Sequence, residues 1–359
     1  MGLISFVHRD TFRLHENPSM HPEKPDRLVA IDKAVGESEL SDILVDVAPW
    51  AATEKDLARI HSPSYLEHLE KIGRLARTEN RFIQLDGDTF MSPWTLETAK
   101  LAAGTGCMAI KSLQGEKITA AFVAARPPGH HAMAERQMGF CIFNNIALAT
   151  VYAREILGYK RVLIIDWDVH HGNGTQDIFY EDPNVLFISM HQYPHWPYDT
   201  GWLTEDGKGE GKGFNLNIPL PAGIGDKGHL LAWDSIIVPV SMEYKPDIIL
   251  VSAGYDAHQN DPMSSQQITT AGFGLLASRL RDLADKLGIK CACFLEGGYD
   301  TKALADSVVA TLRALAKNKD DRNIESELKP ITGDWSPEEL KDRLSLVQKH
   351  FTKYWPSLK

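Results

Sequence analysis

Short runs of apolar residues alternate along the chain with longer stretches in which apolar residues recur every three or four positions. The short runs predict buried strands, and the longer stretches predict amphipathic helices. Apolar strands that alternate with helices are typical of a parallel sheet covered on both faces, so the pattern predicts an α/β fold with helices on both faces of a mostly parallel sheet. The predicted strands are residues 4–8, 118–124, 161–165, 185–190, 214–218, 248–252 and 291–295.

One helix has a clear predicted end. Apolar residues stand at positions 273, 276, 280, 283 and 287, and Gly288 follows directly. Glycine adopts the left-handed conformation that commonly closes a helix, so we expect the helix to end there and its apolar face to pack on the sheet.

The main domain is predicted to span residues 1–316. The charged stretch KNKDDRN, residues 317–323, is typical of a solvated connection. Ser336 and Pro337 then offer an N-cap and a first-turn proline, with the capping-box glutamate Glu339. We expect this tail, residues 317–359, to form a helix that packs on its own domain or, less simply, against an oligomer partner. Its apolar stripe consists of Leu340, Leu344, Val347 and Phe351.

Composition excludes several classes of protein. The 359 residues include 48 acidic and 38 basic ones, a net charge of -10, and 43% are hydrophobic, which excludes disordered and collagen-like chains. The chain has no clustered basic residues, so we expect no nucleic-acid partner. It also has no apolar run of about 18 residues and no signal pattern, so we expect a soluble, cytoplasmic protein with no membrane partner. The four cysteines lack CxxC spacing and are expected to be reduced core thiols.

Polar residues collect where four of the predicted strands end. The segments that follow these strands are Arg126-Pro127-Pro128-Gly129-His130-His131, Asp166 to Gly174, Gly254-Tyr255-Asp256 and Glu296-Gly297-Gly298-Tyr299. Ligand sites of open parallel sheets lie beyond the carboxyl ends of the strands. We therefore expect these four segments to form one site.

The segment after residue 165 predicts a metal centre. If it stays extended, Asp166, Asp168 and His170 face the same side, and Asp256 can complete a set of three ligands. Three ligands with one open position are typical of catalytic zinc, which activates a bound water. Taken singly, these residues are more often loop caps or hydrogen-bond partners, and Tyr299 could be a packing residue. Their convergence at four strand ends favours the site.

Six motifs together resemble those of zinc-dependent histone deacetylases, and the resemblance spans residues 5–316. Asn173 stands where class I members carry Asp, so the sequence is more similar to class II and to bacterial or archaeal relatives. The resemblance implies an arginase-like three-layer α/β fold and hydrolysis of an acyl-lysine or related N-acyl amine to acetate and a free amine. The motifs are His21-Pro22-Glu23, RPPGHH from Arg126, Gly139-Phe140-Cys141, DWDVHHGNG from Asp166, Asp256 to Pro262, and Glu296-Gly297-Gly298-Tyr299.

The resemblance also implies roles for the catalytic residues. One zinc ion is held by Asp168, His170 and Asp256. His131 is the general base and acid, and His130 is the neighbouring electrostatic histidine. The remaining roles fall to Asp166, which orients His130, to Asn173, which orients His131 without a carboxylate charge, and to Tyr299, which donates a hydrogen bond to the oxyanion.

The substrate contacts follow from the same resemblance. Phe140 and Trp196 match aromatic walls around the lysine methylenes, and Asp88 matches a rim acid that holds the substrate backbone. Arg27 matches an arginine of an internal acetate channel, although it could instead be a surface charge at a helix start. Gly139, Met263 and Gly298 complete the expected substrate-binding set. Family sites for K⁺ or Na⁺ lie near Ser189 and Phe179.

Three further functions stay open at this point. The same core would serve an acetylpolyamine amidohydrolase, but one polyamine-specialised branch carries Glu where this chain has Met263, so lysine substrates are favoured. A non-catalytic acyl-lysine binding protein is opposed by the retention of Tyr299 and of three ligands. A two-manganese hydrolase of arginase type would require further acidic ligands on the same loops.

Overall fold

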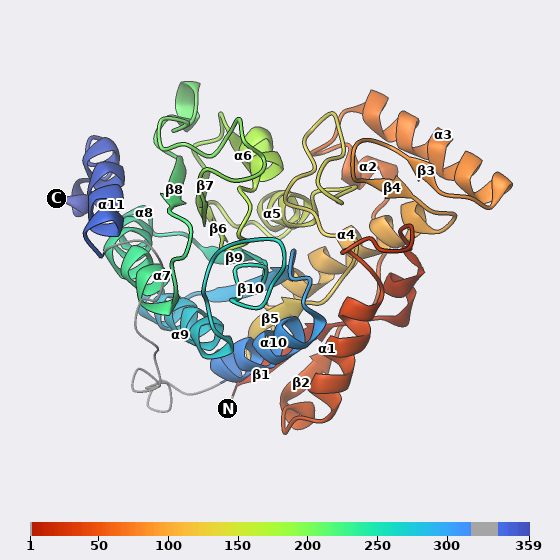
Figure 1. Ribbon diagram of the computed structural model, residues 1–359, viewed down its shortest axis with the longest axis horizontal. Coiled ribbons are helices and arrows are strands. Elements are labelled where there is room, and N and C mark those ends of the chain that lie inside the picture. Colours follow the sequence, from red (N-terminus) through yellow and green to blue (C-terminus); the bar gives the residue numbers. More distant parts are fainter. Residues whose placement is uncertain (1, 317–336) are drawn as a thin grey trace.

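A computed structural model describes residues 2–316 and 337–359 (Figure 1). Eight strands form one parallel sheet in the order β2-β1-β5-β10-β9-β6-β7-β8, and β3 and β4 form a separate antiparallel pair. The strands are β1 (Leu3–Val7), β2 (Leu44–Asp46), β3 (Ile83–Gln84), β4 (Phe90–Met91), β5 (Ile118–Val123), β6 (Val162–Asp166), β7 (Val185–Gln192), β8 (Asn215–Leu220), β9 (Ile248–Ala253) and β10 (Lys290–Leu295).

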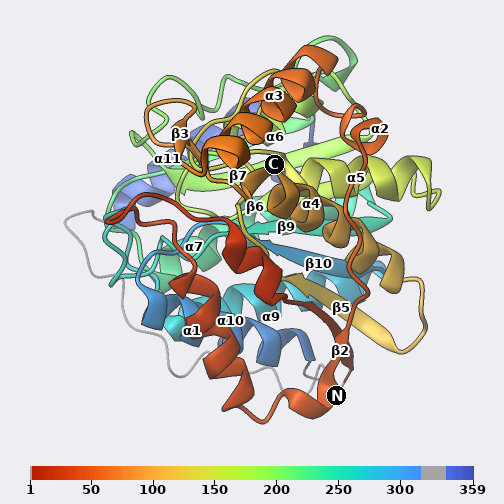
Figure 2. The ribbon, with the colours of Figure 1, turned by 90° about the vertical axis from the view of Figure 1, so that its right-hand side faces the viewer.

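Helices cover both faces of the sheet, as Figure 2 shows, so the three-layer α/β prediction is confirmed. Helices α1, α9 and α10 lie on one face, and α4 and α5 lie on the other. The α-helices are α1 (Asp26–Gly36), α2 (Glu54–Leu57), α3 (Pro63–Glu79), α4 (Thr95–Ser112), α5 (Asn145–Glu155), α6 (Asn173–Phe179), α7 (Asp226–Ala232), α8 (Val238–Tyr244), α9 (Thr270–Leu287), α10 (Thr301–Ala316) and α11 (Pro337–Phe351). The shorter 3-10 and π turns are η1 (Asp10–Leu14), η2 (Ser41–Ile43), η3 (Gly209–Gly211), η4 (Trp233–Ile237) and η7 (Pro356–Leu358).

Strands β6 to β9 form because most of their side chains are apolar on both faces, although β7 and β8 also bury polar residues such as His191 and Asn217. Every residue of β6, β7, β8 and β9 is buried, as expected for strands between two helical layers. All seven predicted strands are present within one or two residues of their predicted ends. The edge strand β2 and the β3–β4 pair are too short to produce an apolar pattern, and the sequence did not predict them.

Two predicted helix features can be followed in the structure. Helix α9 ends at Leu287, and Gly288 closes it with a φ of 69°. The apolar stripe of α11 is buried, and the helix packs against β8 of its own chain. The predicted charged connection 317–323 and the predicted N-cap Ser336 lie outside the described residues.

The strand order decides where the site lies. Strands β5, β10, β9 and β6 are consecutive neighbours in the sheet, although the chain visits them as β5, β6, β9 and β10. The polar segments that follow them therefore meet at one edge of the sheet. Within the described parts of the chain, we find no helix with the length and apolar character that crossing a membrane requires.

Candidate active site

Three buried side chains form a group that could hold a metal ion. Asp168 and His170 follow β6, Asp256 follows β9, and their candidate ligand atoms lie within 4.8 Å of one another. Nδ1 of His170 is 3.1 Å from Oδ1 of Asp168 and 3.1 Å from Oδ2 of Asp256. Two carboxylates and one imidazole suit a divalent cation, so the residues present fit the zinc that the sequence predicts.

The backbone around this group is shaped to hold the carboxylates. The amide of Gly297 donates to Oδ2 of Asp168 at 2.8 Å, and the amide of Val169 donates to Oδ1 of Asp256 at 2.9 Å. A Cβ atom on Gly254 would lie 1.9 Å from Oδ2 of Asp168, and one on Gly297 would lie 2.0 Å from Oδ2 of Asp256. Only glycine fits at these two positions, because the carboxylates occupy the space of a side chain.

The tandem histidines lie beside the metal group, each with a different partner. Nδ1 of His130 is 2.9 Å from Oδ2 of Asp166, and Nδ1 of His131 is 2.8 Å from Oδ1 of Asn173. Their ring centroids are 3.9 Å apart. Asp166 therefore supports His130 instead of completing the metal group, and Asn173 is placed to orient His131 at the first position of α6.

The electrostatic surroundings separate the two histidines. Burial disfavours the charged form of His130, but Asp166, Asp168 and Glu296 outweigh burial and raise the pKa of His130 to about 10. Burial lowers the pKa of His131 well below its usual value, and the positive charges of His130 and His170 lower it further. Near pH 7, one imidazole is thus held protonated and its neighbour is held neutral.

Tyr299 lies across the channel from these histidines and follows β10. Its ring is 5.9 Å from that of Phe140, and the guanidinium of Arg27 lies 5.0 Å from its centroid. Burial, with the carboxylates of Asp256 and Asp168, raises the pKa of the Tyr299 hydroxyl well above its usual value, against the opposing charge of Arg27. The hydroxyl therefore stays protonated and can donate a hydrogen bond.

A channel of about 210 Å³ leads to the metal group and is lined by several of the predicted substrate contacts. Trp196 stands edge-on to His131 at 4.7 Å between ring centroids, and His21 packs edge-on against Phe140 at 4.6 Å. Phe140, which lines the wall, has a φ of 68°. The lining consists of Asp88, His131, Gly139, Phe140, His170, His195, Trp196, Met263 and Tyr299.

Asp88 reaches the channel rim because the β3–β4 turn holds it there. Oδ1 of Asp86 accepts the amides of Asp88 at 3.1 Å and of Thr89 at 2.9 Å, and Thr89 Oγ1 accepts the amide of Phe140 at 3.1 Å. The hairpin and the aromatic wall are thus joined. Burial and the neighbouring Asp86 raise the pKa of Asp88.

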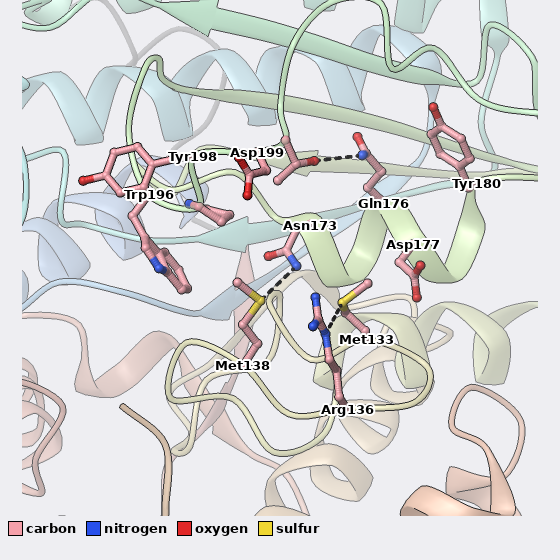
Figure 3. A pocket seen from close by; sticks show the side chains of 12 residues that line it. Met133, Arg136, Met138, Asn173, Gln176, Asp177, Tyr180, Trp196, Tyr198 and Asp199 are labelled. Atoms are coloured by element: carbon pink, nitrogen blue, oxygen red, sulfur yellow. Dashed lines mark hydrogen bonds between the residues drawn. The ribbon is translucent and has the colours of Figure 1, made fainter. Parts of the chain in front are cut away.

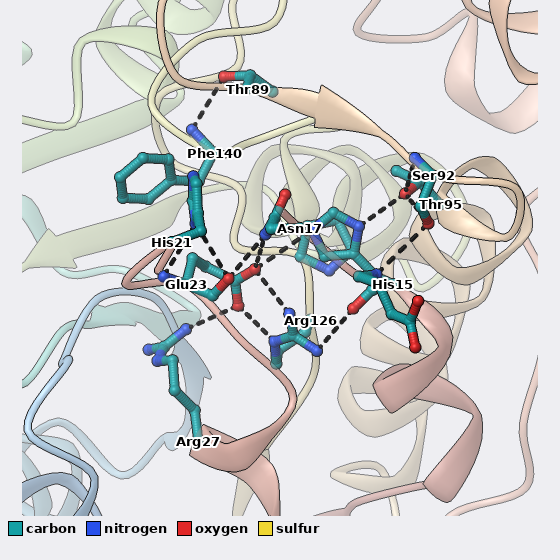
Figure 4. A network of polar contacts seen from close by, with 12 residues as sticks. His15, Asn17, His21, Glu23, Arg27, Thr89, Ser92, Thr95, Arg126 and Phe140 are labelled. Carbon is teal, nitrogen blue, oxygen red and sulfur yellow. Dashed lines mark hydrogen bonds and ion pairs between the residues drawn. The ribbon is translucent and has the colours of Figure 1, made fainter. Parts of the chain in front are cut away.

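Arg27 lies inside the protein, so its interpretation as a surface charge is wrong. It is fully buried, and it donates to the carbonyls of Gly298 and Glu296 and to the carboxylate of Glu23. Glu23 also pairs with Arg126 and lies 3.2 Å from Nε2 of His15 (Figure 4). This buried network holds Arg27 and Gly298 behind Tyr299, outside the channel lining.

One residue close to the reacting groups was missed by the sequence reasoning, and another, Glu296, was placed at the site without a role. His195 lines the channel, stacks on His170 with centroids 5.0 Å apart, and has Nε2 3.0 Å from the Met263 carbonyl. Its only sequence signal is its place directly before Trp196. The carboxylate of Glu296 accepts the amides of Gly129 and His130. The sequence indicated its place in the site only through its position at the end of β10.

The fold places three possible metal ligands at the inner end of a narrow channel, an arrangement typical of hydrolases, and comparison with known proteins identifies the family. The profile described as "Histone deacetylase domain" matches residues 21–315. The chain belongs to the histone deacetylase family, whose members are amide hydrolases.

Similar proteins come from plants, archaea and animals. The chain is 45% identical over 311 residues to "Histone deacetylase 10, chloroplastic" of Oryza sativa subsp. japonica, covering 83% of this chain and 70% of that one. It is 34% identical to a "Probable deacetylase" of Archaeoglobus fulgidus, covering 99% and 100% of the two chains. It is also 34% identical to "Polyamine deacetylase HDAC10" of Homo sapiens, covering 88% of this chain and 48% of the human one.

A solved structure agrees with the fold throughout. The crystal structure of the HDA15 HD domain superimposes with a TM-score of 0.88 at 29% sequence identity, covering 99% of this chain and 96% of that one.

Proposed function

We propose that the protein is a zinc-dependent deacylase that hydrolyses the amide of N-acetyl-lysine in a peptide or protein. The observation that carries this proposal is the channel, because its lining joins an aromatic wall to His131, His170 and Tyr299 at its inner end. A channel of about 210 Å³ suits an extended aliphatic arm that presents an acyl group to the metal centre.

Asp168, His170 and Asp256 would hold the zinc ion. When bound, zinc supplies Lewis acidity, which polarises an acyl carbonyl and lowers the pKa of water. The amides of Gly297 and Val169 keep the two carboxylates oriented. Because the three side chains are buried, bulk water does not compete with the metal for their ligand atoms.

His131 is placed to move the proton. As a neutral imidazole whose Nδ1 hydrogen bonds to Asn173, it can take a proton from water on its other nitrogen while the water oxygen bonds to the acyl carbon. Returning that proton to the amide nitrogen lets the carbon–nitrogen bond break, which releases acetate and a free amine. Tyr299 donates to the oxyanion between these steps, a contribution of about 3 kcal/mol for donors of this kind.

The remaining residues would hold the substrate and the released acetate. Phe140 and Trp196 would pack against the lysine methylenes, and Asp88 at the rim would accept backbone N–H groups of a peptide. Three donor groups of Arg27 are engaged by Gly298, Glu23 and Glu296. A guanidinium has five N–H donors, so two are left to bind acetate behind Tyr299.

The second candidate is hydrolysis of acetylated polyamines, favoured by the likeness to the human polyamine deacetylase. Met263 argues against it, because an apolar rim residue offers no charge to a polyamine. Turnover of an acetyl-lysine peptide and of acetylated spermidine should be compared side by side. We expect faster peptide turnover, and faster polyamine turnover would reverse the assignment.

Two further functions would give distinct results. Binding of an acetyl-lysine peptide without acetate release, with zinc supplied, would show a non-catalytic binding protein. Two manganese ions per chain in a metal analysis would show an arginase-type centre. Structural K⁺ or Na⁺ near Ser189 and Phe179, and the cytoplasmic location, stay predictions from the sequence.

A further inference from the structure

A second cavity, of about 500 Å³, opens beside the channel, and Trp196 lines both. Figure 3 shows that its walls come from three segments: the loop 133–138, the helix α6 with the residue after it, and the loop 196–200. No step of the proposed reaction takes place in this cavity. It is larger than the channel and adjoins it at Trp196.

A third cavity, of about 330 Å³, connects the first two along the rim. It shares Asp88 with the channel, and it shares Arg136 and Met138 with the second cavity. Trp196 lines all three. The three cavities therefore adjoin one another, and a molecule anchored by its acyl group in the channel can extend toward the second cavity.

The chemistry of the second cavity favours a cation. Its lining includes the exposed residues Asp177 and Asp199, of which Asp177 accepts the Ala134 amide. Among residues 2–316 and 337–359, neither forms an ion pair. The aromatic residues Trp196 and Tyr198 also line it (Figure 3). Carboxylates attract ammonium and guanidinium groups, and aromatic faces add cation–π attraction.

One lining residue, Arg136, carries the opposite charge. Its Nε atom donates to Sδ of Met133 at 3.0 Å, and the residue also lines the third cavity together with Asp86 and Asp88. Its charge is thus shared between two cavities that together contain four carboxylates, those of Asp86, Asp88, Asp177 and Asp199. The net charge of the residues that line the two cavities is therefore negative.

The cavity also reaches the catalytic residues. Asn173 lines it and holds His131 through the 2.8 Å hydrogen bond, and its Nδ2 donates to Sδ of Met138 at 3.4 Å. The second cavity is therefore separated from the reacting centre by a single side chain, which is close enough for one small substrate to occupy both.

We propose that the second cavity is an accessory subsite for a second, cationic group of the substrate, an ammonium or a guanidinium bound by Asp177, Asp199 and the neighbouring aromatic rings. This inference rests on the proposed deacylase function. Two sources share the chemistry: a lysine or arginine side chain next to acetyl-lysine in a peptide, and the far amine of an acetylated polyamine.

The test uses pairs of acetyl-lysine peptides that differ only in one flanking residue, arginine or glutamine, placed first before and then after the acetyl-lysine. We expect kcat/KM to be about three- to tenfold higher for arginine in at least one position, the range for exposed ion pairs combined with cation–π contacts. The same comparison with acetylspermidine and an acetylated alkylamine that lacks the far amine covers the second source.

The variants make the test specific. In the Asp177→Asn/Asp199→Asn double variant the arginine-to-glutamine ratio should fall to about one. Asparagine keeps the oxygen that accepts the Ala134 amide, so the local fold has its support. The control is Asp42→Asn, which removes the same charge from an exposed residue in η2, before the edge strand β2. Its ratio should stay that of the unaltered protein.

Each outcome decides the matter. A cation preference in peptides or in polyamines that disappears in the double variant identifies the source and supports the subsite. Equal rates for both members of every pair, a preference for the neutral member, or a preference that survives the double variant would overturn it. Absence of acetate release from every substrate would instead overturn the deacylase function itself.

Discussion

At the scale of single residues, the site depends on pairs whose members differ in protonation. His130 is charged because the carboxylates of Asp166, Asp168 and Glu296 outweigh burial and raise its pKa. His131 is neutral because burial lowers its pKa, and the hydrogen-bond partner Asn173 adds no negative charge that would oppose burial. The sequence could identify these residues, because RPPGHH and DWDVHHGNG are specific motifs. It could not show that His195 lines the channel, or which partners Glu23 and Arg27 have in the buried network, because those contacts depend on the folding of distant segments.

Asn173→Asp tests the neutral orientation of His131. A carboxylate 2.8 Å from Nδ1 would stabilise the imidazolium and raise the pKa of His131 by about one unit or more. The base form then appears only at higher pH, so the acid limb of the kcat/KM profile should move upward by the same amount. Asn80→Asp adds the same charge at the exposed end of α3 and should leave the limb in place. An unmoved limb in Asn173→Asp would contradict the role of His131.

Tyr299→Phe removes only the hydroxyl that would donate to the oxyanion. We expect kcat to fall by about 10²- to 10³-fold with bound zinc unchanged, because the ring still packs against Phe140. Tyr159→Phe, which removes a hydroxyl just before β6, is the matched control for turnover. Steady-state kinetics with metal analysis measures both, and nearly full activity in Tyr299→Phe would show that the oxyanion is stabilised elsewhere.

At the scale of elements, the sequence predicted those strands whose residues are buried along their whole length. Strands such as β6 and β9 lie between two helical layers, so their apolar runs stand out in the sequence. The β3–β4 pair has two residues in each strand and depends on turn hydrogen bonds at Asp86, which leave no apolar pattern. That pair nevertheless positions Asp88 at the rim.

Two glycines at helix ends should respond to alanine in opposite directions. Gly288 closes α9 at a φ of 69°, and no atom lies within 4 Å of a Cβ placed there, so Gly288→Ala should lower the free energy of unfolding by about 1 kcal/mol through backbone strain alone. Gly36 is the last residue of α1, and its Cβ would also meet nothing, so Gly36→Ala should stabilise by a few tenths to about 1 kcal/mol. Denaturant unfolding measures the free energy of unfolding of both variants. A change of the same sign in both would contradict the roles given to Gly288 and Gly36.

At the scale of the whole molecule, the metal site concentrates negative charge in the interior. Asp166, Asp168, Asp256 and Glu296 are all fully buried at one edge of the sheet. Burial raises the pKa of Glu296 to about 7, which shows how costly further negative charge is there. A cation at Asp168 and Asp256 should therefore stabilise the fold as well as the reaction.

Removing the metal with a chelator should lower the melting temperature, and added zinc should restore it. A ligand present at 1,000 times its Kd stabilises by about 4 kcal/mol. Asp256→Asn retains an acceptor for the Val169 amide but lowers the affinity for the metal ion. The melting temperature of this variant should therefore respond little to the chelator. If the melting temperature of the unaltered protein does not change when the chelator is added, no metal stabilises the fold.

The strand order has a consequence for synthesis. Strand β10 is the last strand in the chain, yet it lies between β5 and β9 near the middle of the sheet. A nascent chain that has reached only β9 has two half-sheets with a gap between them, and it lacks the Gly297 amide that grips Asp168. The site, which also needs Tyr299, can therefore be complete only after residues 290–299 have been synthesised and β10 has paired with both of its neighbours.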